Sequence, residues 1–320
     1  MDDLWIILPS VLLEGLLAGC VLAMIALGYT MVYGVLGMIN FAHSEVFMIG
    51  AVAGVETFRH LGPVVPNPFV LLLASLIMAA LVSGGTAVAI ERLAYRPLRR
   101  HGGTNRLVPL ITAIGVSFLL QDLVRLVEGL WHNEFYLNYP ARAELEKTFD
   151  LTETLSIQMK SVLVLVVSAV MLVSLHLLVK RTRLGKAMRA VAQDAETAAL
   201  MGIPPNRVIS RTFLIGGALG GVAGVLWGLM YTQVTPYMGF TPGVKAFTAA
   251  VLGGIGSLPG AMVGGIVLGV IESLFGTYLP FLTDGVIGSE YKDVFSFLIL
   301  VLLLIVRPQG LLGRRGGDKV

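Results

Sequence analysis

Five long stretches of this 320-residue chain contain no Asp, Glu, Lys or Arg: 15–44, 61–90, 161–179, 212–244 and 246–271. A helix that crosses the hydrocarbon core of a bilayer needs about 20 predominantly apolar residues. Only 13% of the chain is charged, against roughly 25% in soluble domains. A water-soluble core cannot hide so much apolar surface, so the sequence predicts an all-α polytopic membrane protein with one transmembrane domain over 1–320.

The N-terminal segment does not have the pattern of a cleaved signal peptide. The first ten residues, MDDLWIILPS, contain two aspartates and no basic residue, and the apolar run that follows is longer than a signal h-region. The single cysteine, Cys20, excludes an intramolecular disulfide. We therefore expect the first apolar segment to remain as a membrane helix.

The distribution of charge predicts the topology. Basic residues exceed acidic ones by five to one, seven to two and four to one in three segments: 91–106, 180–211 and 307–320. Acidic residues dominate three others: 1–14, 128–160 and 279–293. Because short cytoplasmic loops carry an excess of Lys and Arg, the basic segments are predicted to be cytoplasmic. The N-terminus is then outside and the C-terminus cytoplasmic.

This alternation predicts nine membrane segments, within a range of 8–10 transmembrane or re-entrant helices. Six are expected near 11–34, 44–58, 69–90, 107–127, 160–180 and 212–233. Three more are expected within 244–306: a short segment before GSLPG, then 260–278 and 292–306. Several are too short to cross a hydrocarbon core of about 30 Å. Such half-helices are tolerated only where protein or a water-filled cavity covers the backbone.

Glycines recur at intervals of four residues in two apolar segments. One series is Gly216, Gly220, Gly224 and Gly228, and a second region pairs Gly260 with Gly264 and Gly265 with Gly269. This spacing places small residues on one helical stripe, which lets helix backbones approach closely in lipid. Helix packing is the favoured interpretation, and a pathway lined by backbone is the alternative.

The motifs of the common enzyme and metal sites are missing. The chain has no G-x-x-x-x-G-K-[ST], H-E-x-x-H or G-x-S-x-G sequence and no pair of cysteines. We expect no catalytic residue, no cofactor and no metal on this chain. The informative polar residues instead occur at membrane depth, which favours a passage for a solute.

A polar cluster ends the first apolar run. Asn40, His43, Ser44 and Glu45 lie within GMINFAHSEVFMIGA, residues 37–51. VLGMI at 35–39 recurs as VLGGI at 251–255, and each copy precedes a break and another apolar segment. Helix breaks lie at the pathway in repeat-built transporters. The four residues either cap backbone groups freed at the break or line a gate, and both interpretations stay open.

Ionisable residues also interrupt other apolar spans. Ionisable groups inside a membrane usually face the interior of the helix bundle and mark functional sites. Glu272, like Glu45, is a candidate for the pathway or gate. Glu14 and Lys245 are instead interpreted as residues at the membrane interface.

The basic loop 181–211 differs from an ordinary connection. Its sequence favours a helix from Lys186 to Met201, which Gly202 ends before Pro204 and Pro205. On this helix Ala190, Asp194, Ala198 and Met201 share one side, while Arg189, Gln193 and Glu196 point elsewhere. Docking to a cytoplasmic partner and lying on lipid headgroups are equally compatible with this pattern.

The loop sequence D-A-E-T-A-A-L-M-G-I-P resembles the coupling loop of permease subunits of bacterial ABC importers. ALGYTMVYGVLGMINFAHSEVFMIGA, RLVPLITAIGVSFLLQD, FTAAVLGGIGSLPGAMVGGIVLGVIES and VRPQGLLG resemble the permeases of branched-chain amino acid importers. One departure is Ser44, where the family commonly has Gly. The resemblance implies a coupling role for six residues: Arg189, Asp194, Glu196, Ala198, Ala199 and Gly202.

The same resemblance implies a permease in a bacterial inner membrane that works with several partners. These are a second homologous permease, two cytoplasmic ATPases that bind ATP and Mg, and a periplasmic solute-binding protein. The implied substrates are branched-chain or other hydrophobic, neutral amino acids. Urea or short amides are the alternative cargo, and an ATP-independent channel or secondary transporter is a less favoured class.

Overall fold

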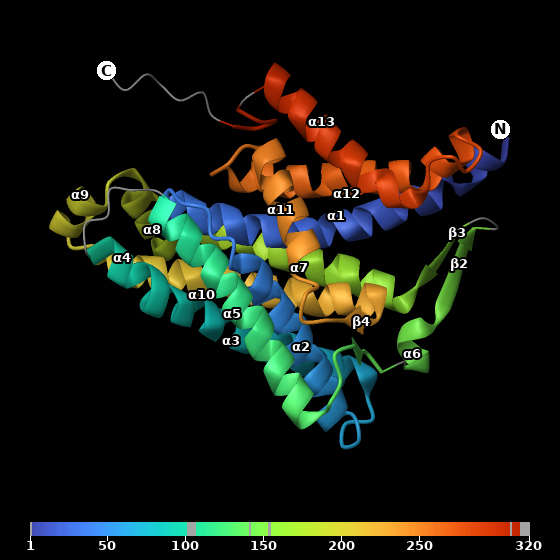
Figure 1. Ribbon diagram of the computed structural model, residues 1–320, viewed down its shortest axis with the longest axis horizontal. Coiled ribbons are helices and arrows are strands. Elements are labelled where there is room, and N and C mark those ends of the chain that lie inside the picture. Colours follow the sequence, from blue (N-terminus) through green and yellow to red (C-terminus); the bar gives the residue numbers. More distant parts are fainter. Residues whose placement is uncertain (1, 101–106, 141, 153–154, 308, 314–320) are drawn as a thin grey trace.

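The computed structural model describes residues 2–100, 107–140, 142–152, 155–307 and 309–313 (Figure 1). The helices of the first half are α1 (Asp2–Leu36), α2 (His43–Leu61), α3 (Pro68–Ile90), α4 (Arg96–Arg100), α5 (Leu107–Trp131), α6 (Ala143–Glu146) and α7 (Met159–Arg181). Those of the second half are α8 (Arg183–Gln193), α9 (Ala195–Leu200), α10 (Pro205–Tyr231), α11 (Phe240–Gly253), α12 (Leu258–Leu282) and α13 (Lys292–Val306). A π-helical turn, Glu91–Tyr95, joins α3 to α4, and a 3₁₀ turn, Ser289–Tyr291, precedes α13.

Each of the nine predicted membrane segments corresponds to a helix in the described residues. Six helices are long and apolar enough to cross a membrane: α1, α3 with its continuation, α5, α7, α10 and α12. The other three segments, α2, α11 and α13, are shorter or less apolar. α1 and α10 begin well before their predicted starts. Apolar residues mark only the part of a helix inside the hydrocarbon core, whereas the helix itself begins at a local signal such as Pro205 in the first turn of α10.

Two helices form the centre of the bundle. In α1 and in α10, 72% of an 18-residue apolar stretch is buried inside the protein, whereas in α5 only 17% of such a stretch is buried. Every residue from Val21 to Leu27 of α1 is at most 1% exposed. A helix that is apolar on all sides belongs in such an interior position, and the apolar outer faces of α5 and α7 are left for lipid or for another membrane subunit.

Glycines bring α1 and α12 into backbone contact. A Cβ added at Gly15 or Gly19 would lie 2.8 Å from the Cα of Val270 or Ile266 on α12. From the other side, Gly265 and Gly269 face Ala23 and Gly19. Close approach of backbones supplies the van der Waals contact that holds helices together in lipid.

The charged segments lie at opposite ends of the bundle. Figure 1 shows α4, α8 and α9 together at one end, and β2 (Thr148–Thr152), β3 (Leu155–Gln158) and the start of α1 at the other. The described parts of two basic segments, 91–106 and 180–211, therefore share an end, and strands β2 and β3 of the acidic region 128–160 are at the opposite end. This arrangement agrees with the predicted alternation, while the assignment of each end to a side of the membrane stays a prediction.

The chain turns back after α10 and forms a half-helix. β4 (Gln233–Val234) pairs antiparallel with β1 (Leu137–Asn138), and α11 then runs for 14 residues, about 21 Å. The last carbonyls of α11 would lack helical partners. Leu311 and Leu312 donate backbone hydrogen bonds to Leu252 and Gly253 at 2.8 and 3.0 Å, so the C-terminal segment covers the end of the short helix.

Candidate functional site

The first helix break is held together by Asn40. Gly37 ends α1 with φ +66°, and the Oδ1 atom of buried Asn40 accepts hydrogen bonds from the backbone N–H of Ala42 (3.1 Å) and the hydroxyl of Tyr95 (2.8 Å). The side chain therefore satisfies a backbone donor just before α2 and ties the break to the π-helical turn after α3. Asn40 thus satisfies a backbone group at the break, although it is not the N-cap of α2.

Ser44 does not cap the helix. Its hydroxyl donates to the carbonyl of Phe41 (2.7 Å) and to Oε1 of Glu45 (3.1 Å), and α2 has no side-chain cap among the described contacts. Ser44 lies inside the first turn of α2 rather than before it, so it is not the N-cap, but its hydroxyl satisfies the carbonyl of Phe41 at the break. Its Cβ instead fills the space beside Gly243 of α11.

Glu45 joins α2 to α5. The carboxylate is fully buried, and its Oε1 accepts hydrogen bonds from Ser117 Oγ and Gln121 Nε2, both at 2.9 Å. Its Oε2 has no hydrogen-bond partner among the described residues and faces Gly239 at the start of α11. Buried charges need hydrogen bonds to offset desolvation, so these contacts hold the otherwise exposed helix α5 against the break.

His43 lies between α1 and α10 because glycine occupies both facing positions. A Cβ at Gly28 would lie 2.0 Å from its Nε2 atom, and a Cβ at Gly220 would lie 3.3 Å from its Cε1 atom. The ring also packs edge-on against Tyr29, with centroids 4.9 Å apart. In the sequence, His43 belongs to the polar cluster at the first break and Gly220 belongs to the glycine series of 216–228. The fold brings these two residues into contact.

The two related breaks lie side by side. Ile39 from the first break and Ile255 from the second line one small cavity with Tyr29 and Phe247. The second break needs the left-handed backbone of Gly254, with φ +103°. The structure thus gathers both copies of the VLG-x-I sequence at one place between α1 and α11.

The glycine series of α10 faces several neighbours rather than one. Gly216 lies against Gly28 of α1, and a Cβ at Gly224 would lie 2.3 Å from the carbonyl oxygen of Phe47 in α2. At Gly228 a Cβ would lie 2.1 Å from the ring of Tyr139, which comes from the segment between α5 and α7. The stripe therefore makes close approach possible along the whole length of α10.

Glu272 belongs to a buried ion cluster. The ammonium group of Lys245 pairs with Glu272 and with Asp293 Oδ1, the latter at 2.8 Å. Lys245 is 7% exposed, so it faces the interior of the bundle rather than its outer surface. The contact depends on how α11, α12 and α13 pack, because 27 residues separate Lys245 from Glu272. Beside the cluster is a cavity of about 350 Å³.

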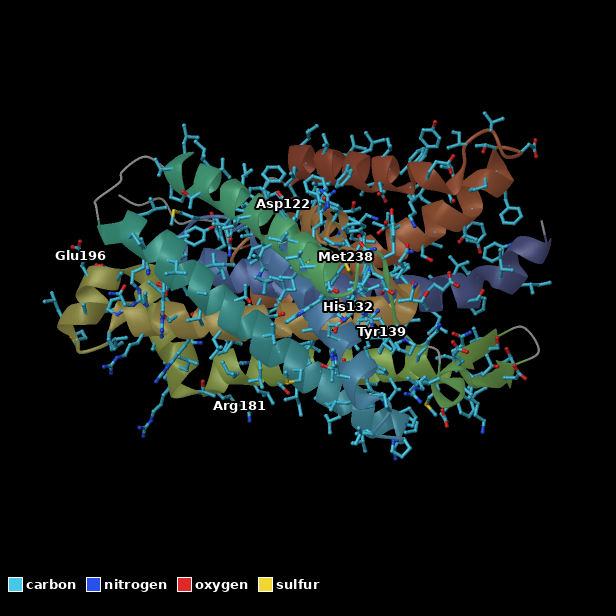
Figure 2. All side chains as sticks on the ribbon, turned by 60° about the horizontal axis from the view of Figure 1, so that its bottom comes forward. Asp122, His132, Tyr139, Arg181, Glu196 and Met238 are labelled. Atoms are coloured by element: carbon cyan, nitrogen blue, oxygen red, sulfur yellow. The ribbon has the colours of Figure 1, made fainter. Side chains whose placement is uncertain are left out.

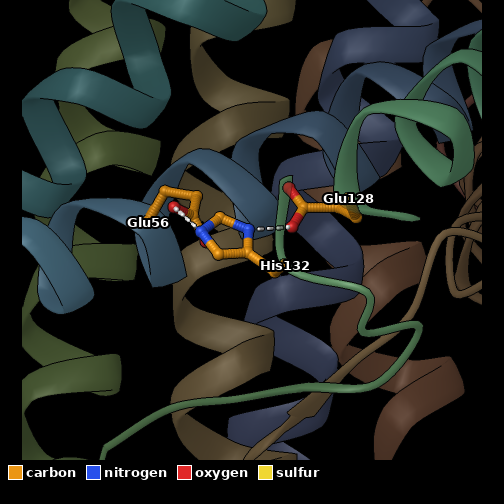
Figure 3. Close-up of side chains that lie close together, drawn as sticks. All are labelled: Glu56, Glu128 and His132. Carbon is orange, nitrogen blue, oxygen red and sulfur yellow. Dashed lines mark hydrogen bonds and ion pairs between the residues drawn. The ribbon is translucent and has the colours of Figure 1, made fainter. Parts of the chain in front are cut away.

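A second group of ionisable side chains joins α2 to α5 (Figure 3). His132 Nδ1 lies 3.1 Å from Glu128 Oε2, and its Nε2 lies 3.9 Å from Glu56 Oε2. One ligand atom of each residue lies within 4.8 Å of the others, so these three side chains are the candidate metal ligands of the described region. However, Arg59 and His60 also contact Glu56 at 3.4 and 3.3 Å. Arg59 already offers Glu56 a positive partner, so a network of ion pairs and polar contacts explains the group without a metal.

The prediction of one continuous helix from Lys186 to Met201 is wrong, because the structure has two helices there, α8 and α9. Asp194 is extended (φ −158°, ψ 110°) and separates α8 from α9. Its Oδ1 accepts hydrogen bonds from the backbone N–H groups of Glu196 (2.9 Å) and Thr197 (3.1 Å). Hydrogen bonds from the hydroxyl and N–H of Thr197 hold the pKa of Asp194 below its ordinary value. An aspartate is a preferred N-cap, so the sequence DAET contained the signal that was missed.

The break also changes which residues of this segment face outward. Ala198 is 4% exposed, whereas Leu200 and Met201 are 88% and 78% exposed. Gly202 ends α9 with φ +81°, and Arg189 donates a hydrogen bond to the carbonyl of Val179 at the end of α7. Figure 2 shows Glu196 at the outer tip of the helix pair. Ala199 is also exposed. Leu200 was not among the predicted site residues.

Comparison with known proteins gives one family. A model described as "Branched-chain amino acid transport system / permease component" matches residues 11–304. The chain is 41% identical to the LivH permease protein of Salmonella typhimurium, over 100% of both chains. It is 43% identical to the BraD permease protein of Pseudomonas aeruginosa, over 97% of each. Both relatives are described as permeases of a high-affinity branched-chain amino acid transport system. No solved structure matches the chain.

Proposed function

The chain belongs to the family of branched-chain amino acid transport system permease components, and we propose that it forms part of the membrane pathway of an ATP-driven importer for branched-chain or other hydrophobic, neutral amino acids. The names of its relatives support this substrate class. The family is a transport family rather than an enzyme family. ATP hydrolysis is assigned to separate subunits, which bind ATP and Mg, and this chain is assigned no cofactor.

The proposal includes a second permease chain. About half of this chain, 157 residues, is 33% identical to the LivM permease protein of Escherichia coli, whose name places it in the same kind of transport system as LivH. The lipid-facing surfaces of α5 and α7 offer apolar area for such a pairing. The remaining partners are two cytoplasmic ATPases and a periplasmic solute-binding protein, in a bacterial inner membrane with the N-terminus outside.

The observation that carries the proposal is the exposed tip of α9. Leu200 and Met201 are neighbouring apolar side chains on a projecting helix pair at the basic end of the bundle. An exposed apolar pair at a polar, basic surface supports a contact with another protein, and a contact with lipid is the competing interpretation. Residues 181–211 are accordingly proposed as the coupling loop that docks on the ATPase.

A buried ion network supports transmission from this loop into the bundle. Glu91, fully buried in the π-helical turn, accepts hydrogen bonds from Arg96 (2.9 Å) and from Ser210 near the start of α10 (2.8 Å). Arg99 also pairs with Glu91. These contacts tie the end of α3 to the start of α10, which forms the last part of the loop. Because the centre of the bundle is close-packed, a displacement of α10 is passed to its neighbours rather than absorbed.

The gate in this proposal is the pair of helix breaks. The glycine contacts place α10 against α1 and α2, which flank the first break with Asn40, His43, Ser44 and Glu45. In the proposed cycle, closure of the ATPases on ATP moves α9 and α10, and the breaks change the access of the pathway. The coupling residues Arg189, Asp194, Glu196, Ala198, Ala199 and Gly202 would hold or form the docking element, with Leu200 and Met201 at its contact surface.

The test is Leu200→Asp, with Leu151→Asp as the matched control. Both leucines are exposed in this chain, at 88% and 61%, but Leu151 lies on β2 at the opposite end. Burying an unpaired carboxylate in an interface costs several kcal/mol, and each ~1.4 kcal/mol is tenfold in affinity. We expect Leu200→Asp to reduce ATPase co-purification and binding-protein-stimulated hydrolysis at least tenfold, and Leu151→Asp to leave both unchanged.

The competing interpretation, a helix lying on lipid headgroups, predicts intact ATPase association for both variants. Wild-type co-purification and hydrolysis for Leu200→Asp would therefore refute the docking role of α9. A substitution at Ala198 is unsuitable for this test because Ala198 is already buried inside this chain, and a charge there would damage the fold of the loop itself.

A further inference from the structure

The cavity beside Glu272 combines charged and apolar walls in one place. Its volume is about 350 Å³, within the ~300–1,000 Å³ range of small-molecule sites. It lies between α1, α10, α11, α12 and the start of α13. The charged residues of its wall are Glu14, Lys245, Glu272 and Lys292. These come from the half of the bundle that holds the start of α1 and the end of α10 (Figure 1).

Groups of both signs reach this cavity. Lys245 and Lys292 are the cations, and Glu14 and Glu272 are the carboxylates. Asp293 lies behind them, in its contact with Lys245. If all five groups are ionised, three carboxylates face two ammonium groups and the cluster carries one net negative charge. Binding of an ammonium group would therefore balance the charge of the cluster. A carboxylate on the same ligand would have to pair with one of the two lysines.

Glu14 is the carboxylate that the fold leaves available. Among the described residues it has no hydrogen bond or ion pair, and its side chain is exposed at the cavity. Glu272, by contrast, is paired with Lys245 and 7% exposed. An approaching ammonium group can thus pair with Glu14 directly, whereas a carboxylate drawn to Lys245 competes with Glu272 and Asp293 for its ammonium group.

The remaining wall is apolar and small. Ala18 and Leu22 of α1, Gly269 and Gly276 of α12, and the ring of Trp227 present aliphatic and aromatic surface. Trp227 is held in place by its ring contacts with Phe47 and Tyr231, at centroid distances of 6.0 and 4.4 Å. This apolar surface can pack against an uncharged aliphatic side chain. It offers no partner to a charged side chain.

We propose that this cavity binds an amino acid zwitterion during transport, with Glu14 taking the α-ammonium group, Lys245 and Lys292 taking the α-carboxylate, and the aliphatic side chain resting on α1 and Trp227. The inference rests on the proposed function and deepens it, because it assigns to this chain a substrate site of its own. A zwitterion meets both signs of charge without adding net charge to a low-dielectric site, where unpaired charge is costly.

The first experiment compares Glu14→Gln with Glu144→Gln in the complete reconstituted transporter. Both substitutions remove one exposed carboxylate at the same end of the bundle, but Glu144 lies on α6, away from the cavity. Glu14→Gln is expected to raise the KM for leucine uptake about tenfold, which corresponds to ~1.4 kcal/mol, with complex yield unchanged. Glu144→Gln is expected to retain the wild-type KM. A wild-type KM for Glu14→Gln would overturn the inference.

The second experiment needs no variant and so does not depend on folding. Binding of radiolabelled leucine to the wild-type complex without its binding protein is challenged with isopentylamine, which lacks the carboxylate, and with 4-methylpentanoate, which lacks the ammonium group. Each is expected to compete about tenfold more weakly than leucine. Equal competition by either analogue, or no leucine binding at all, would overturn the zwitterion site.

The two proposals fail separately. If the wild-type transporter imports no branched-chain amino acid, the proposed function is wrong. If it imports leucine while Glu14→Gln has the wild-type KM, or the analogues compete as well as leucine, the transporter stands and the site in this cavity is refuted.

Discussion

A single methyl group at Gly224 should separate α2 from α10. In the structure, a Cβ built at this position lies 2.3 Å from the carbonyl oxygen of Phe47 and 2.7 Å from the backbone nitrogen of Ala51. Both atoms belong to the backbone of α2, so no side chain can rotate away. To reach ordinary van der Waals contact α2 must retreat by about 1 Å, which removes close packing on both sides of the contact.

The magnitude follows from two opposing effects. Overpacking a close contact costs typically ~1–3 kcal/mol, while replacing glycine by alanine inside a helix gains about 1 kcal/mol of propensity. The net loss for Gly224→Ala is therefore up to about 2 kcal/mol. In domains of 150–250 residues each kcal/mol shifts Tm by roughly 2–4 °C, so we expect a decrease of up to about 8 °C.

The matched control is Gly216→Ala on the same stripe of the same helix. There the nearest atom, the carbonyl oxygen of Gly28, would be 3.5 Å from the new Cβ, which is ordinary contact. The propensity gain is unopposed at this site, so the Tm should stay the same or rise. Thermal unfolding of the purified protein, followed by size-exclusion chromatography of heated samples, measures both variants. Equal Tm values for the two would refute the role of backbone contact at Gly224.

Three further predictions test other parts of the structure. Glu45→Ala should destabilise the protein more than Glu45→Gln, by ~1–3 kcal/mol, because it leaves Ser117 and Gln121 without their acceptor; equal Tm values for the two variants would contradict this. The lowered pKa of Asp194 means that its cap stabilises α9 above the ordinary aspartate pKa of about 3.9 and is lost as the pH falls through the lower folded value. Hydrogen exchange in 195–200 should accordingly accelerate on acidification in the wild type and be fast at all pH values in Asp194→Ala, and an unchanged exchange profile would exclude the cap. In a Cys20→Ala background, a cysteine at Glu144 should react with an impermeant maleimide from outside the cell and a cysteine at Ala195 only after permeabilisation; labelling of position 195 from outside would overturn the topology.

The membrane fold follows from sequence patterns that do not depend on tertiary contacts. Charge-free runs predict the helices because lipid cannot solvate ionised side chains. The alternation of basic and acidic segments predicts their order across the bundle, and all nine expected segments are helices in the described residues. The errors are in the helix boundaries. α1 and α10 begin before their predicted starts, because each helix extends beyond its apolar segment.

Local capping signals were also present in the sequence, although one was overlooked. The aspartate in DAET specifies the break between α8 and α9 through its own side-chain hydrogen bonds. The prediction of one helix over 186–201 gave the propensity of alanine more weight than this cap, and so put Ala198 on the same side as Met201 and missed Leu200. The Asp194 side chain competes with helix carbonyls for the same backbone N–H donors, which allows the helix to end and restart at this residue.

Only the tertiary structure decided which distant residues meet. Lys245 and Glu272 become ion partners because α11 and α12 fold back on each other, and Glu45 meets Gln121 because α5 packs across the first break. His43 fits beside Gly28 and Gly220 because three helices converge there. A sequence records the chemistry of each of these residues but not their separation. Helix periodicity describes one element at a time, whereas the cavity beside Glu14 is formed by elements from both ends of the chain.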